Sequence, residues 1–114
     1  MKLTEIIKDL NLSVFQEGEG DPVIKSGYAG DLLSDVMGNA AANSIWVTIQ
    51  PHQNIVAVSL LANIPAVILS RGVKPHDLAI EKAKEEGIWL LGTDETSFEI
   101  IGRLYSLGIK GTKR

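Results

Sequence analysis

Polar side chains able to bind a ligand follow three apolar segments of this 114-residue chain. They are Thr48, Gln50, His52 and Asn54 after the first segment, Ser70, Arg71 and Gly72 after the second, and Thr93 and Asp94 after the third. If the apolar segments are parallel strands, their carboxyl ends meet at one edge of the sheet, where the following helices present free N–H groups. Arg71 is the only Lys or Arg among these residues. The pattern therefore favours a small polar or anionic ligand at this edge.

An earlier segment, Gly27–Asp31, adds Tyr28 and Asp31 as candidates for a fourth wall of the same site. Tyr28 lies between two glycines, so its ring is placed either to stack on a base or to cover the edge of the sheet. All of these residues also have a purely structural interpretation. Asn, Ser, Thr and Asp are the usual helix caps and turn formers, and Asp31 is suited to cap a short helix. Both interpretations stay open at this point.

Catalysis is a minor alternative. A hydrolase or transferase would use His52 with Asp31, Asp35 or Asp94 as acid and base, since Asp31 and Asp35 would share one helix face. The sequence contains neither a G-x-x-x-x-G-K-[ST] phosphate loop nor a G-x-S-x-G elbow, and it has no cysteine. A cysteine nucleophile, a disulfide and a thiolate zinc site are therefore excluded. We expect no metal ion, no cofactor and no enzymatic activity.

The elements that would position these residues follow from apolar periodicity and from turn residues. Apolar residues spaced three and four apart near the start predict a helix, and later strands alternate with helices, which indicates a parallel sheet. The expected helices are 3–10, 32–37, 52–62, 77–86 and 96–107, and the expected strands are 13–16, 23–27, 45–49, 66–69 and 88–91. The prediction is a single compact α/β domain with a mostly parallel sheet and βα repeats. It spans residues 1–109, followed by a basic flexible tail at 110–114.

The middle of the chain lacks charge altogether. Charged residues make up 22% of the chain, yet Val36–Ser70 contains no Asp, Glu, Lys or Arg. The helix expected in this window is apolar nearly all round, so it is either buried deep in the domain or covered by a second subunit. We favour the second reading, which predicts a homodimer. The expected interface residues are Ile55, Val56, Val58, Ser59 and Leu60.

Bulk properties restrict the partners. The formal net charge is -3 and the sequence pI is about 5.3, which argues against nucleic acid as a partner. The most apolar run, 55–69, contains Asn63 and Pro65 and is shorter than the ~20 residues that span a bilayer. The first residues form a charged amphipathic segment with no secretory signal. We therefore expect a cytoplasmic protein without membrane association.

The chain resembles the DRTGG domain family, a module similar to the N-terminal domain of HPr kinase/phosphorylase. The resemblance rests on Gly27–Met37, on Trp46–Gln50 with His52–Ala57, on the apolar strand before Ser70–Gly72, and on the segment from Glu85 to Asp94. It covers about residues 1–109. The Thr-Gly-Gly that gives the family part of its name is replaced here by Ser70-Arg71-Gly72.

This resemblance implies an α/β fold like that of the N-terminal domains of HPr kinase and the Mur ligases. It also implies a regulatory, often dimeric, accessory role beside an enzyme. We therefore expect a non-catalytic, homodimeric module that senses a small anionic or nucleotide-like ligand. The alternative is a scaffold subunit that binds an enzyme partner and no small ligand.

Overall fold

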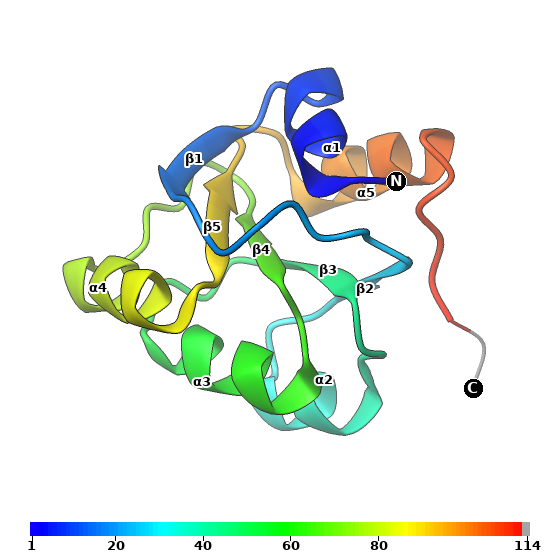
Figure 1. The fold of residues 1–114 in the computed structure, drawn as a ribbon. Coiled ribbons are helices and arrows are strands. Elements are labelled where there is room, and N and C mark those ends of the chain that lie inside the picture. The colour runs from blue at the N-terminus through cyan, green and yellow to red at the C-terminus, as the bar shows by residue number, and fades with distance from the viewer. Residues whose placement is uncertain (113–114) are drawn as a thin grey trace.

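The chain folds into a five-stranded sheet with helices on both faces (Figure 1). The computed structural model describes residues 1–112. In chain order the elements are α1 (Leu3–Asp9), β1 (Ser13–Gln16), β2 (Ser26–Ala29), α2 (Leu33–Asn39), β3 (Ser44–Thr48), α3 (Asn54–Ala62), β4 (Ala66–Leu69), α4 (Asp77–Glu86), β5 (Trp89–Gly92) and α5 (Ser97–Ser106). The predicted single α/β domain with βα repeats is confirmed.

The strand order explains where the loops meet. The order is β1-β5-β4-β3-β2, and β2 to β5 are parallel, whereas β1 pairs antiparallel with β5. The helices that connect the parallel strands, α2, α3 and α4, all lie on one face, as right-handed crossovers require (Figure 1). Helices α1 and α5 cover the other face. The carboxyl ends of four strands therefore lie along one edge of the molecule.

The three central strands are buried on both faces. Every residue of β3, β4 and β5 is buried. Trp46, Val67 and Leu90 pack against α2, α3 and α4, while the alternate side chains, such as Val47 and Ile68, pack against α1 and α5. A strand covered on both faces needs apolar side chains at every position, which accounts for the uninterrupted apolar runs in the sequence.

The all-round apolar helix α3 is buried by its own domain. It packs on the sheet with α2 and α4 on either side. The exposed fractions of Ile55, Val56, Val58 and Ser59 are 0%, 1%, 6% and 0%. These four residues cannot form the predicted dimer interface, and that part of the prediction is wrong. Of the five, only Leu60 reaches the surface, with 40% of its area exposed.

Several expected boundaries differ from the structure by one or two residues, and two differences are larger. Residues 23–27 were expected as a strand, but Val23 forms an isolated bridge with Lys2, and β2 starts at Ser26. The predicted flexible tail does not start at residue 110. The C=O of Lys110 accepts a hydrogen bond of 2.9 Å from Gly27 N, and Gly111 N donates to the hydroxyl of Tyr105 over 3.3 Å. Residues 113–114 of that predicted tail lie outside the described residues.

Gly18 is predicted to be required for packing. A Cβ at this position would lie 2.5 Å from Trp89 Cδ1 and 2.6 Å from Trp89 N, and backbone atoms of a central strand cannot move aside. We expect Gly18→Ala to lower the free energy of unfolding by about 1–3 kcal/mol in urea denaturation. Gly102→Ala is the matched control, because no atom lies within 4 Å of its Cβ position in α5. It should stabilise the protein by about 0.5–1 kcal/mol, and equal effects of the two substitutions would contradict the packing argument.

A second prediction concerns the hydrogen bonds of Asp21 to the first turn of α1. Asp21 accepts from Thr4 Oγ1 at 2.7 Å and from Thr4 N at 3.0 Å, and these bonds lower the pKa of Asp21. Their stabilisation is complete above the ordinary Asp pKa and is lost as the pH falls through the lowered value in the folded state. Thr4→Ala should raise the pKa of Asp21 in an NMR titration. An unchanged value would show that the side-chain bond is not the main cause.

Candidate functional site: the polar rim

The loops at the carboxyl ends of β2 to β5 form one surface, which we call the polar rim (residues 30–32, 48–54, 70–76 and 92–96). Hydrogen bonds between neighbouring loops hold it together. Gln50 Nε2 donates to Asp31 O over 3.0 Å, and Gly72 N donates to Thr93 O over 2.9 Å. The three groups of polar residues predicted from the sequence do lie on one edge of the sheet.

Asp31 joins the loop after β2 to the loop after β3. Its Oδ1 accepts from the buried hydroxyl of Thr48 at 2.8 Å and from Ile49 N at 2.9 Å. Asp31 was expected to cap α2, but the N-cap residue is Leu32, and it makes no side-chain capping bond. The carboxylate of Asp31 therefore fixes the geometry of the rim.

Tyr28 does not join the rim, contrary to the expected fourth wall. Its hydroxyl donates to Asp35 Oδ2 over 2.6 Å, and its ring packs against the core on the α2 side of the sheet. The other oxygen of Asp35 accepts from Asn39 Nδ2 at 3.0 Å. Asp35 thus links α2 to β2 and is not aligned with Asp31 as an acid–base pair.

The loop after β4 contains the turn that replaces the Thr-Gly-Gly of the DRTGG family. Arg71 and Gly72 have φ angles of 59° and 69°, the left-handed values of a tight turn that normally takes Gly or Asn. Arg71 N donates to Glu95 O over 2.7 Å, so the turn is fastened to the loop after β5. The Arg71 side chain is exposed and is free to meet an anion from solvent. Ser70 is buried, and its hydroxyl shares a bond of 2.6 Å with Ser97.

Two histidines meet at the start of α3 and α4. The rings of His52 and His76 lie 6.0 Å apart between centroids and are inclined at 72°. Nδ1 of His52 accepts from Asn54 N at 3.1 Å, so Nε2 of the neutral ring carries the proton and can donate. His76 is missing from the predicted site because 24 residues of sequence separate the pair. The sequence signal that could identify it is its position just before α4.

Side-chain capping accounts for only some polar residues of the first two loops: His52 accepts from the first N–H of α3, and α4 has no side-chain cap. The N-cap residues of α3 and α4 are Gln53 and His76, and neither makes a side-chain capping bond. At α5 the N-cap residue is Thr96, and its Oγ1 accepts a hydrogen bond from Glu99 N. An uncapped helix N-terminus such as that of α4 carries partial positive charge and attracts anions. The histidine pair lies beside this N-terminus, whose first turn also carries Asp77, and Arg71 adds an exposed cation to the rim.

The described residues were also searched for other kinds of site. Among them, no three His, Cys, Asp or Glu side chains lie close enough together to hold a metal ion. No described helix is long and apolar enough to cross a membrane.

Comparison with known proteins now gives the family. A model described as HPr Serine kinase N terminus matches residues 48–107, which is more than half of the chain. The chain belongs to this family. The matched segment begins at Thr48 and includes all three loops from β3 to β5, so it covers most of the polar rim. No curated protein gives a match.

A solved structure shares the fold. It contains the CBS and DRTGG domains of the regulatory region of Clostridium perfringens pyrophosphatase, complexed with activator, diadenosine tetraphosphate. The TM-score is 0.69 at 18% sequence identity, and the match covers 95% of this chain but only 47% of that chain. The predicted DRTGG-like fold is confirmed, and this chain spans about half the length of that protein.

Removal of the Asp31 carboxylate should destabilise the rim. Asp31→Ala leaves the buried Thr48 hydroxyl without its acceptor, and we expect a loss of about 1–3 kcal/mol in the free energy of unfolding. Asp94→Ala is the matched control. Asp94 is exposed and makes no side-chain hydrogen bond to another described residue, so the change should stay within about 0.5 kcal/mol. Urea denaturation of both variants measures the difference, and equal losses would contradict the structural role of Asp31.

Proposed function

We propose that this chain is a non-catalytic regulatory module that senses a small anionic, nucleotide-like ligand at the polar rim. The observation that carries the proposal is the contact between the rings of His52 and His76 at the starts of α3 and α4, beside the N-terminus of α4, which has no side-chain cap. Arg71 adds an exposed cation on a turn held in a fixed geometry. Backbone N–H groups, imidazole and guanidinium together are the donors that bind phosphate oxygens.

The geometry supports binding better than catalysis. Two of the three carboxylates considered for acid–base work, those of Asp31 and Asp35, are hydrogen-bonded within the fold. The family and fold comparisons support a regulatory role, since the similar Clostridium perfringens structure is a regulatory region complexed with a dinucleotide activator. We propose that the enzyme regulated by this chain is a separate partner or a neighbouring domain.

The ligand proposal is tested by thermal shift with adenine nucleotides, including diadenosine tetraphosphate. A ligand present at a hundredfold excess over its dissociation constant should stabilise the protein by about 2.7 kcal/mol. Arg71→Ala and His52→Ala should each remove much of the shift. Lys84→Ala is the matched control, because Lys84 lies in the last turn of α4, away from the rim. No shift with any nucleotide, or a shift that both rim variants retain, would contradict the proposal and favour a scaffold subunit without a small ligand.

Homodimerisation remains a prediction, but the interface residues expected from the sequence must be replaced by others. Since Ile55, Val56 and Val58 are buried, a second copy could contact α3 only through its outer surface, where Leu60 and Leu61 are 40% and 70% exposed. We propose that this outer surface of α3 mediates the contact with the second copy.

Leu61→Glu tests this contact directly. It should convert a dimer to a monomer in sedimentation at tens of micromolar protein, because a charge would be buried against the second copy. Leu78→Glu on α4 is the control, since Leu78 is also exposed, at 57%, and should leave the dimer intact. A wild-type protein that stays monomeric, or a dimer that Leu61→Glu does not affect, would contradict the proposal.

A further inference from the structure

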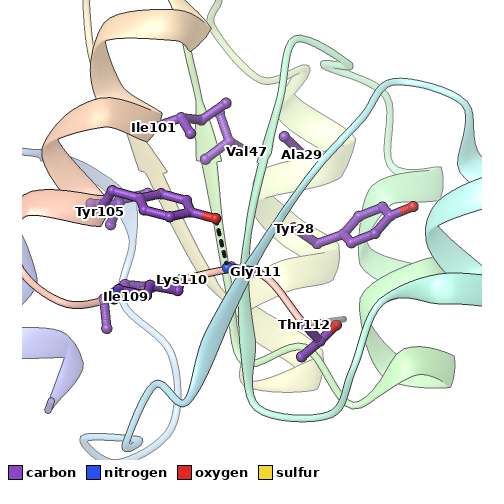
Figure 2. A pocket seen from close by; sticks show the side chains of 11 residues that line it. Tyr28, Ala29, Val47, Ile101, Tyr105, Ile109, Lys110, Gly111 and Thr112 are labelled. Atoms are coloured by element: carbon purple, nitrogen blue, oxygen red, sulfur yellow. Dashed lines mark hydrogen bonds between the residues drawn. The ribbon is translucent and has the colours of Figure 1, made fainter. Parts of the chain in front are cut away.

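A small hollow lies on the α5 side of the sheet, at the open edge formed by β2. Its volume is about 250 Å³, and it is enclosed by β2, α5 and the C-terminal segment that follows α5. Figure 2 shows Ile101 and Tyr105 of α5 on one side and Ala29 of β2 on the other, with Val47 between them. Leu104 and Ile109 complete a mainly apolar lining. The ring of Tyr28 points away from Tyr105, on the other side of β2.

The hollow exists because β2 has almost no side chains on this face. Gly27 and Ala29 pair with Ile45 and Val47, so they alternate onto the face that α5 covers. Nothing in the packing requires a glycine at position 27. A Cβ there would meet no atom closer than 3.6 Å, an ordinary van der Waals distance. An alanine would therefore fit at this position, and the absence of larger side chains at positions 27 and 29 leaves the hollow open.

The described lining of the hollow includes a few hydrogen-bonding groups and one charged residue. Gly27 N donates outward to Lys110 O. By the alternation of a parallel strand, the N–H and C=O of Ala29 point to the same open edge, and no described residue outside the sheet pairs with them. The hydroxyl of Tyr105 accepts from Gly111 N, which leaves its own proton available. Among the residues that the structure describes, Lys110 is the one charged residue in the lining.

We infer that this hollow binds a small monocarboxylic acid with an apolar body about the size of one aromatic ring. A cavity of about 150 Å³ lined by aliphatic and aromatic side chains accommodates benzene, so the larger volume here leaves room for a short acidic side chain. An apolar lining with a few placed polar groups is the usual form of a small-molecule site. Lys110, the one cation of the described lining, favours an anionic head group, and Ala29 N–H and the Tyr105 hydroxyl supply neutral donors in the same lining.

An extended peptide added to the β2 edge fits these observations less well. Strand addition depends on a row of free main-chain groups. Here the chain's own C-terminal segment already occupies the N–H of Gly27, and within β2 only Ala29 presents both groups outward. This site is separate from the proposed nucleotide site, because the polar rim contains none of the lining residues named above.

The probe for the test is phenylacetate, with phenylacetamide as a neutral molecule of the same shape. In an NMR titration of the whole chain, phenylacetate should give saturable shifts of the amides of Ala29, Ile101, Tyr105 and Gly111. Phenylacetamide should bind more weakly. Shifts that rise linearly without saturation, or that are spread over the surface, would overturn the site. Equal binding of the neutral amide would overturn the choice of a carboxylic acid.

Two variants localise the binding. Ala29→Trp should weaken it at least tenfold by filling the hollow, and the exposed position of Ala29 favours a folded variant. Lys110→Gln should weaken it by up to about fivefold, as expected for an exposed ion pair. The controls Lys84→Gln and Arg71→Ala should bind normally, and Arg71→Ala also separates this site from the rim. Unchanged affinity in both Ala29→Trp and Lys110→Gln would overturn the inference.

Discussion

The rest of the structure depends on one constraint, the burial of β3, β4 and β5 on both faces. A short chain can cover both faces of a parallel sheet only if it supplies two layers of helices itself. Three crossover helices form one layer, and α1 and α5 form the other. A charge on the central strands or on the inner side of α3 would be buried without a partner, at a high cost in free energy. This constraint explains the absence of charge from β3, β4 and the inner side of α3. It does not explain the exposed uncharged positions of Val36–Ser70, such as Met37 and Leu61.

Because helices cover both faces of the sheet, a ligand can bind only at the loops that follow the strands or at an edge strand. One such place is the polar rim, where the loops after four strands meet and bond to one another through Asp31 and the turn at Arg71. The other is the edge strand β2, whose α5 face holds only Gly27 and Ala29 before the chain reaches the rim. The two surfaces differ in chemistry. The rim presents Arg71 and the uncapped N-terminus of α4 to solvent, whereas the hollow is mainly apolar, with Lys110 in its described lining.

Local sequence patterns predicted most of the helices and strands, because the formation of each element depends mainly on residues close together in the sequence. The bounds of β1, β4 and α4 are as expected, and the capping residue of α5 is Thr96. The patterns failed where the answer depends on a distant partner. Val23 pairs with Lys2 and not with the sheet, Tyr28 turns toward Asp35, and α3 is covered by α2 and α4. His76 and the hollow were missed for the same reason, since each is formed by segments far apart in the sequence.

The central claim is that the domain by itself, without a second subunit, buries β3, β4 and the inner side of α3. Amide hydrogen exchange at a protein concentration where the chain is monomeric tests this claim most directly. If it is correct, the amides of Ile55, Val56 and Val58 in the monomer exchange as slowly as those of β3 and β4, through global unfolding alone. Rapid exchange of these α3 amides in the monomer, with protection gained only as a dimer forms, would contradict the account.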